Sequence, residues 1–175
     1  MFLIVRQNRL IFFFFLTVLL AACSSEPQFE KGKFERVHLA AQEVKNAIIV
    51  GASHEQFGEL LKKLSAEISA IEGTEKIGKE EELLKGYRDL LAIYRDGYLL
   101  WKYRNEFTRY GFVPKGSIYV GQDVEPVAEK YRIPTEDHVY EPTRKAWKSI
   151  SEDSIRIVWM NADSQLKIIE NILNY

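Results

Sequence analysis

The sequence predicts an all-α fold, a four-helix bundle with a long, partly structured connection between its third and fourth helices. Prolines divide the chain, because Pro27 is followed by none until Pro114, Pro126, Pro134 and Pro142, and none follows those. Proline-free stretches of this length allow long helices. Within them, apolar residues recur at steps of three and four, the spacing of one helix face. Four such faces packed on a shared apolar centre make a bundle.

The first 22 residues have the layout of a secretory signal peptide. Arg6 and Arg9 precede an uncharged apolar run over residues 10–22, which includes four successive phenylalanines. A helix that crosses the hydrocarbon core of a membrane needs ~20 apolar residues. The run is shorter than that and falls in the range of a signal-peptide hydrophobic region. We therefore expect the segment to be removed on export.

The apolar run ends in Leu20-Ala21-Ala22-Cys23, which resembles the lipobox of bacterial lipoproteins. The resemblance covers the signal region only. It implies that the chain is cut between Ala22 and Cys23 and that lipid is attached to Cys23. Cys23 is also the only cysteine, so a disulfide within the chain does not explain it. The alternative is an ordinary secretory signal followed by an incidental cysteine.

The resemblance also implies an address in the bacterial cell envelope. Two or three acyl chains anchor a protein durably, since each buried methylene contributes about 0.8 kcal/mol and one chain alone binds reversibly. Serine, not aspartate, follows the cysteine, at Ser24 and Ser25. In a host with two membranes, this implies the outer membrane, with the protein facing the periplasm. We expect residues 23–33 to form a lipidated tether and residues 34–175 the helical bundle domain.

The charge balance of the mature chain argues against nucleic acid as a partner. Of the 24 basic residues, Arg6 and Arg9 are lost with the signal peptide and no acidic residue is lost, which leaves 22 basic and 25 acidic side chains. The net charge of −3 offers no basic patch for phosphates or anionic lipids. We expect contact with the membrane through the N-terminal lipid alone, and a single domain.

The first two helices are expected to form an antiparallel pair joined by a tight turn. Gly51 suits a left-handed C-terminal cap, and Ser53 with Gln56 makes an S-x-x-Q capping box. The chain therefore stops and restarts a helix within a few residues. The apolar faces are Phe34, Val37, Ala41, Val44 and Ile48 in the first helix, and Phe57, Leu60, Leu61, Leu64, Ile68 and Ile71 in the second.

The third helix is expected over about residues 79–109 and the fourth over about 143–174. Gly86 and Gly97 lie inside the third, where each costs about 1 kcal/mol relative to alanine, so a neighbour packs closely there or the helix bends. The apolar faces are Leu83, Leu84, Tyr87, Leu90, Leu91, Tyr94, Tyr98 and Trp101, then Trp147, Ile150, Ile157, Val158, Ala162, Leu166, Ile169 and Leu173.

The connection over residues 111–142 is too long for a turn. It contains a β-favouring patch over residues 118–120 and a helical turn expected to begin at Pro126 and close near Tyr131. A connection of this length could return along the bundle, which would make the fourth helix parallel to the third. It could instead cover one end of the bundle. The sequence leaves both arrangements open.

No complete metal or cofactor motif is present in the sequence. Glu35 and His38 make one Glu-x-x-His pair, but a di-metal bundle site needs two such pairs and two further glutamates. His54 and His138 have no glutamate three residues before them. Cys23 is not in a C-x-x-C-H motif for haem attachment. We therefore expect no metal and no cofactor, with Glu35 and His38 at the surface.

Catalytic motifs are also missing, and we expect the chain not to be an enzyme. No G-x-S-x-G turn occurs. The remaining candidate is a group of acids in the connection, Asp123, Glu125, Glu136 and Asp137, near His138. Acidic residues in a loop are usually solvated, but convergent carboxylates would favour an envelope hydrolase.

Aromatic residues are concentrated in the second half of the chain, where all nine tyrosines and all three tryptophans lie at or after Tyr87. Tyr87, Tyr94 and Trp101 recur at steps of seven and are expected to line the core. Other aromatics extend past this seam toward the connection. Tyrosine and tryptophan are favoured in binding surfaces, since they combine apolar area with a polar group. The expected interaction surface consists of Tyr103, Phe107, Tyr110, Phe112, Tyr119 and Tyr131.

These observations favour a membrane-anchored envelope lipoprotein that acts as a non-enzymatic interaction or scaffold module, with another envelope protein as its partner. The first alternative is a bundle that binds a small apolar ligand between its helices. The second is the envelope hydrolase. An open, aromatic-lined cavity would favour the ligand, and a closed core would favour the protein partner.

Overall fold

The computed structural model describes residues 29–74, 76, 78–107 and 111–174. Residues 31–175 form one compact unit, distinct from residues 1–30. The predicted cleavage site at Ala22 and Cys23 and the predicted contact residue Tyr110 lie outside the described residues. No helix among the described residues has both the length and the apolar character needed to cross a membrane.

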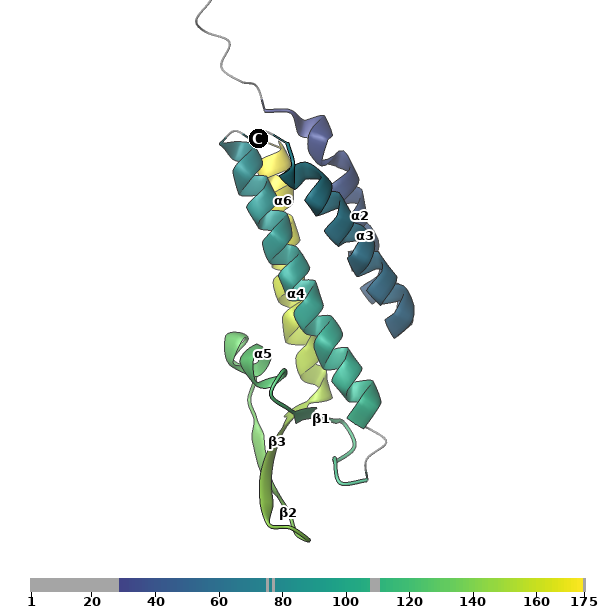
Figure 1. The fold of residues 1–175 in the computed structure, drawn as a ribbon, viewed down its shortest axis with the longest axis vertical. Coiled ribbons are helices and arrows are strands. Elements are labelled where there is room, and N and C mark those ends of the chain that lie inside the picture. Colours follow the sequence, from purple (N-terminus) through teal and green to yellow (C-terminus); the bar gives the residue numbers. More distant parts are fainter. Residues whose placement is uncertain (1–28, 75, 77, 108–110, 175) are drawn as a thin grey trace, which may run out of the picture. The chain divides into compact units, whose positions relative to one another are not determined.

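The unit is mostly helical, as predicted, and Figure 1 shows its arrangement. The long helices are α2 (Glu35–Val50), α3 (His54–Glu72), α4 (Lys79–Phe107) and α6 (Ile155–Asn174). The first three lie close to where the sequence predicted them. A short 3-10 helix, η1 (Lys31–Phe34), precedes α2.

The turn between α2 and α3 has the predicted geometry. Gly51 adopts a left-handed conformation with φ 74°, and its N–H donates to the carbonyl of Ala47. The hydroxyl of Ser53 accepts from the Gln56 N–H at 3.2 Å, and the Gln56 side chain accepts from the Ser53 N–H at 2.9 Å. The two helices lie side by side and run in opposite directions (Figure 1), so the predicted antiparallel pair is confirmed.

The direction of α6, which the sequence left open, is set by its contacts with α4. Gly86, near the start of α4, lies beside Ile169, and Gly97 lies beside Trp159. As the residue number rises along α4, it falls along α6, so the two helices are antiparallel. The connection therefore covers one end of the helices. Close packing against α6 explains why two glycines lie inside α4. The sequence predicted either such packing or a bend in the helix.

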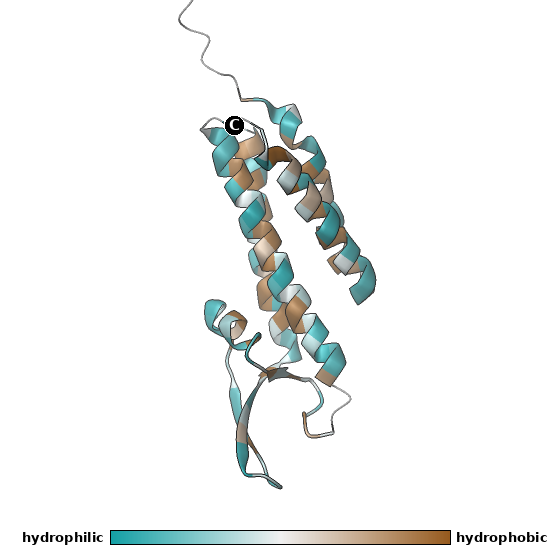
Figure 2. Cartoon of the chain, in the orientation of Figure 1, coloured by the Kyte–Doolittle hydropathy of each residue, from teal (hydrophilic) through white to brown (hydrophobic). Residues whose placement is uncertain are grey.

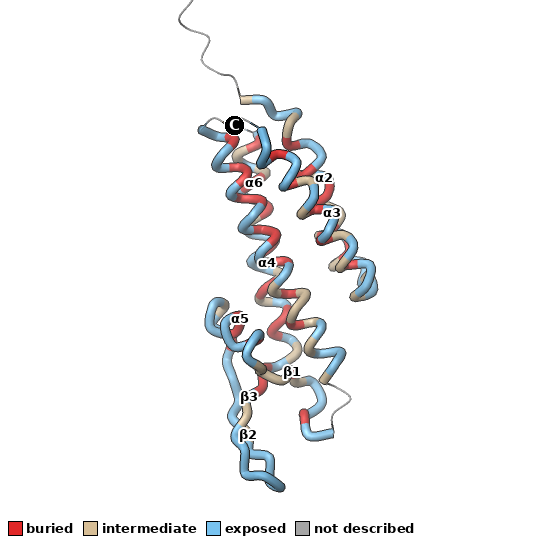
Figure 3. Tube along the Cα trace, in the orientation of Figure 1, coloured by how far each residue is buried: buried red, intermediate tan, exposed pale blue. Residues whose placement is uncertain are grey.

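The core between the long helices is formed by the predicted apolar faces. Figure 2 shows the apolar stripes of the helices, and Figure 3 shows that buried residues follow them. Tyr87 and Tyr94 are almost fully buried within it, and burial raises the pKa of both phenols, so they stay neutral. The largest fully buried side chains here also include Phe34, Phe57, Leu64, Leu83, Leu84, Leu90 and Leu166.

The connection folds as a small sheet with one short helix. The predicted β-favouring patch forms β1 (Ser117–Val120), and the predicted helical turn forms α5 (Glu125–Lys130). Two further strands, β2 (Glu136–Tyr140) and β3 (Lys145–Ser151), make a hairpin. All neighbours are antiparallel in the order β1-β3-β2, with Ile118 opposite Ile150 and His138 opposite Trp147.

Two fold predictions are therefore wrong. The fold is not all-α, and the last helix begins at Ile155 instead of near Thr143. The spacing of Trp147 and Ile150 fits a helix face, but Trp147 pairs with His138 across a hairpin, and Ile150 pairs with Ile118 of the distant strand β1, which a local pattern does not reveal. The polar residues after Ile150 mark the true boundary, because they form the 3-10 helix η2 (Glu152–Ser154), where the Ser151 hydroxyl accepts from the Asp153 N–H.

A second group of buried residues fixes the sheet to the helices. It joins Leu100 of α4 and Val158 of α6 to Ile118, Val127 and Ile150. This packing uses one face of the sheet only, since side chains alternate along a strand. The other face of the sheet, which includes Tyr119 and Trp147, is left to form a separate surface.

Candidate functional site

Five aromatic side chains gather where the end of α4 meets this other face, and we call them the aromatic patch: Tyr103, Phe107, Phe112, Tyr119 and Trp147. The rings of Tyr103 and Phe107 are stacked with centroids 5.1 Å apart, and Phe107 is stacked on Tyr119 at 5.0 Å. Tyr119 lies 5.9 Å from Trp147, and Phe112 lies edge-on to Trp147 at 5.5 Å. The patch is thus one continuous set of ring contacts.

Local structure explains why these residues meet. Tyr103 and Phe107 are four residues apart in α4, so they lie on the same side of the helix. Tyr119 is opposite Ser149, which is two residues from Trp147 on β3, so their side chains share a face of the sheet. Phe112 reaches this face from the loop between α4 and β1.

The hairpin extends the patch with two more rings. His138 is opposite Trp147 in the ladder and stacks on its ring at 4.1 Å. Tyr140 lies two residues further along the same face, and its ring is 5.8 Å from Phe112. Phe112 and Tyr140 are each 41% exposed. Large exposed apolar side chains that are contiguous commonly mark a binding surface.

Hydrogen bonds fix the polar groups of the patch. The Tyr103 hydroxyl donates to Asp123 Oδ2 at 3.1 Å, and His138 Nε2 lies 2.8 Å from the Ser149 hydroxyl. Burial is the largest cause and the hydrogen bond to Asp123 the next, and both raise the pKa of Tyr103, so this phenol is neutral. The patch therefore presents apolar ring surface with a few polar groups already oriented, as binding surfaces often do.

The structure brings together four of the six predicted contact residues: Tyr103, Phe107, Phe112 and Tyr119. Tyr131 lies elsewhere, since its hydroxyl donates to Asp96 of α4 at 2.8 Å and its ring lies under the ammonium of Lys130. Burial and Asp96 raise its pKa. Tyr131 therefore holds α5 on α4 and is not part of the aromatic patch.

Sequence reasoning missed three residues of this surface. Trp147 was assigned to the core face of the last helix, and the β2 residues His138 and Tyr140 were left in the connection. The alternation of His138 and Tyr140, followed by Pro142 and a turn, is the signal of a hairpin that could have found them. The turn itself needs Arg144 at φ 56°, an unusual conformation for arginine.

The acidic residues of the connection do not converge on one point. Asp123 accepts from Tyr103, and Glu125 pairs with Lys148 at 3.3 Å. Glu136 and Asp137 are exposed on β2, while His138 is engaged with Ser149 and Trp147. Acid and base catalysis needs such groups within hydrogen-bond reach of a common reacting atom. The arrangement offers no such point among the described side chains.

The Glu35-x-x-His38 pair is not arranged to hold a metal. Glu35 is exposed, as expected, but His38 is half-buried. One ring nitrogen of His38 lies 3.1 Å from the Tyr87 hydroxyl, and the other lies 3.0 Å from the Gln42 amide. Burial lowers the pKa of His38, partly opposed by Glu170. Among the described residues, no three His, Cys, Asp or Glu side chains gather as metal ligands would.

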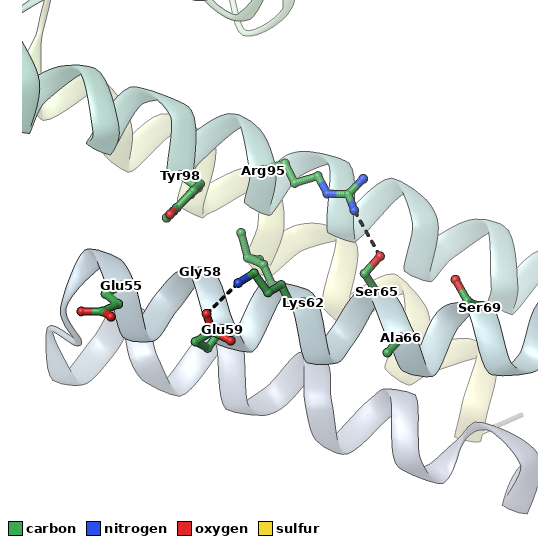
Figure 4. A pocket seen from close by; sticks show the side chains of 10 residues that line it. Glu55, Gly58, Glu59, Lys62, Ser65, Ala66, Ser69, Arg95 and Tyr98 are labelled. Atoms are coloured by element: carbon green, nitrogen blue, oxygen red, sulfur yellow. Dashed lines mark hydrogen bonds and ion pairs between the residues drawn. The ribbon is translucent and has the colours of Figure 1, made fainter.

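At least three hollows lie between the helices. One, about 590 Å³, is a groove between α3 and α4, where Arg95 donates to Ser65 and Lys62 pairs with Glu59 (Figure 4). Another, about 570 Å³, lies between α2 and α3 beside Glu43 and Gln56. The third, about 280 Å³, lies beside Trp101 and Trp159, is bordered by the Arg104–Glu152 ion pair, and falls just below the usual size of a small-molecule site.

Comparison of the chain with protein families, with curated proteins and with solved structures finds no match.

Proposed function

We propose that the chain is a lipid-anchored protein of the bacterial envelope, and that its mature domain binds another envelope protein through the aromatic patch. The lipobox-like sequence ending at Cys23 supports the anchor. The observation that carries the binding proposal is the contiguous, partly exposed set of rings on the sheet face that the core does not use. In this proposal the four long helices act as a four-helix bundle that supports the sheet.

The position of the patch supports a role in reaching a partner. The domain begins at Lys31, whose ammonium lies 3.5 Å from Asn174 at the end of α6, and Lys33 pairs with Glu80 at the start of α4. The patch lies at the other end of α4, a 29-residue helix that spans ~43 Å at 1.5 Å per residue. A domain held at Lys31 by a lipidated tether would thus present the patch at the far end from its attachment.

The shape of the surface favours a macromolecule over a small ligand. The aromatic patch lines none of these three hollows between the helices; the two larger ones are bordered by side chains that form ion pairs, and the third is small. A ring surface with exposed edges and fixed polar groups resembles the centre of a protein interface. A small ligand bound beside Trp101 and Trp159 is the alternative, and it would depend on those two residues and not on Phe112.

The proposal is tested by capture of the partner in the native envelope. The variant carries Phe112→Ser with Tyr140→Ser, which removes the two most exposed rings. The matched control carries Met160→Ser with Ile168→Ser, which are exposed apolar residues of α6 at 66% and 52%. After chemical crosslinking, the control should capture the same protein as the wild type, and the patch variant should lose it.

The circular dichroism of both variants should match that of the wild type, because none of the four side chains belongs to the buried core. Equal capture by the patch variant would overturn the proposal. Loss of capture in the α6 control alone would move the binding surface to that helix.

A further inference from the structure

The sheet has two outer edges, and they differ in what covers them. β1 packs against α4, whereas β2 is the outer strand of a hairpin that extends past the helices (Figure 1). Four of the five β2 side chains are exposed, and only His138 is half-buried (Figure 3). No described strand pairs with the outer edge of β2. Its outward backbone groups are therefore free to pair with another chain.

β2 has some of the features that protect natural edge strands from pairing, namely short length and charged side chains, but not others. Protected edges also commonly carry lysine, an internal proline or a bulge. β2 has no lysine and no proline, and it pairs with β3 one residue to one from Glu136 to Tyr140, without a bulge. Pro134 and Pro142 lie just outside it and limit the edge to a short segment. The edge is thus short, regular and accessible.

The edge is continuous with the aromatic patch. His138 and Tyr140 belong to β2, and their rings contact Trp147 and Phe112 of the patch. A strand added to β2 would place every second side chain on this same face. Those side chains would lie next to His138 and Tyr140, where apolar and aromatic neighbours contribute most.

The charges of β2 select among possible strands. Glu136 and Asp137 lie side by side in sequence, so one carboxylate points to each face, and both are exposed. Neither forms an ion pair with any side chain that the structure describes. Opposite charges directly across two strands stabilise the pair, and like charges destabilise it. A second β2 in antiparallel, two-fold register would set Glu136 opposite Tyr140 and Asp137 opposite Val139, so both carboxylates would lack a basic partner.

We propose that β2 accepts an extended segment of the partner as a fourth strand, with lysine or arginine beside Glu136 and Asp137 and apolar side chains beside Tyr140. This inference depends on the proposed function, because it assigns the binding mode of the same surface. The backbone of the added strand supplies affinity, and its alternate side chains supply specificity.

A random-peptide selection on the unlipidated domain, residues 24–175, provides the probe. The selected peptides should be rich in lysine or arginine at alternate positions and in apolar residues beyond them. Each peptide is then made in two further versions, one N-methylated on its odd-numbered backbone amides and one on its even-numbered amides. One version should lose binding and the other should keep it, because an added strand hydrogen-bonds through alternate amides. Equal binding by the two versions would overturn strand addition.

Variants then locate the peptide. Glu136→Lys with Asp137→Lys should weaken binding about tenfold or more, because two favourable cross-strand pairs become repulsive. The matched control is Glu129→Lys, an exposed acid on α5 that should leave binding unchanged. If peptides lose affinity with Phe112→Ser but not with the β2 variant, the aromatic patch is the site and strand addition is wrong. If neither variant changes the affinity for the peptides, both strand addition and the proposed function are wrong.

A second copy of this chain is the competing occupant of the edge. Sedimentation of the domain should show a monomer at the concentrations used for peptide binding. A dimer that dissociates in the Glu136→Lys, Asp137→Lys variant would show that β2 pairs with itself, and it would overturn the proposal.

Discussion

Trp159 of α6 packs its ring against Gly97 of α4 so closely that a side chain at position 97 would overlap it. Further along the same interface, the Gln165 amide donates to the Gly86 carbonyl at 3.2 Å. Glycine inside a helix costs about 1 kcal/mol relative to alanine. The two glycines therefore let α4 and α6 approach closely, which larger residues at these positions would prevent.

Replacing Gly97 with alanine should destabilise the domain by about 1–3 kcal/mol, despite the better helix propensity of alanine. The added methyl overlaps the Trp159 ring, so the ring or the helix has to move. Chemical denaturation measures the loss. The double variant Gly97→Ala, Trp159→Leu should show a favourable coupling energy, because leucine leaves room for the methyl. Strict additivity of the two changes would mean that the ring does not occupy this position.

Gly51 and Gly73 form a matched pair of helix caps that should respond differently to alanine. Gly51 has φ 74°, whereas Gly73 has φ −75°, and neither has a neighbour within reach of an added Cβ. Gly51→Ala should cost about 1–2 kcal/mol of unfolding free energy, because a left-handed conformation is strained for alanine. Gly73→Ala should be within about 0.5 kcal/mol of the wild type. Equal effects on the thermal midpoint would contradict the assigned turn.

The stability of the domain should fall below about pH 6.5 through His38. Burial is the largest effect on His38 and lowers its folded-state pKa from the ordinary 6.5. The charge of Glu170 raises the pKa in part, and the charge of Lys31 lowers it further. As the pH falls through 6.5, the unfolded chain binds a proton before the folded one does, so unfolding is favoured. The loss ends once the pH is below the folded-state pKa.

Urea denaturation at several pH values between 5 and 8 measures this dependence. The His38→Gln variant retains a group that can hydrogen-bond the Tyr87 hydroxyl but does not titrate in this range. Its stability should change less with pH than that of the wild type. An identical pH profile in both proteins would show that other groups cause the dependence.

The anchor is tested by Cys23→Ser. The substituted chain should accumulate as an uncut precursor without acyl label, because the proposed modification requires the thiol. Radiolabelled fatty acid and the mobility of the chain on a denaturing gel give the readout. A variant that is processed normally and still sediments with membranes would remove the lipid anchor from the proposed function.

The sequence was most informative where structure is local. The Gly51 cap, the capping box of Ser53 and Gln56, and the boundaries of α2, α3 and α4 follow from backbone conformation and from the spacing of apolar residues. The helical turn at Pro126 was found for the same reason. These features are determined within a few residues of chain.

The errors lie in the sheet, where one pairing was overlooked and the other is distant in sequence. The spacing of Trp147 and Ile150 fits a helix, yet Trp147 pairs with His138 across a hairpin and Ile150 pairs with Ile118 of β1. The assembly of the patch depends on that pairing, since it brings Trp147 beside Tyr119 across 28 residues. Tyr131 resembled a contact residue by type, but its hydroxyl is used by Asp96 of α4. Composition therefore indicated an aromatic surface without identifying all of its members.

Site-specific photo-crosslinking in living cells tests the central proposal most directly. A photoreactive phenylalanine analogue replaces Phe112 in the patch or Tyr140 beside it on β2. In the controls it replaces Leu39 or Met160, which are exposed on α2 and α6 at 53% and 66%. Irradiation should give one crosslinked envelope protein from positions 112 and 140, and little or none from positions 39 and 160. Equal yields from all four positions, or a product from α2 and α6 alone, would contradict binding through the aromatic patch.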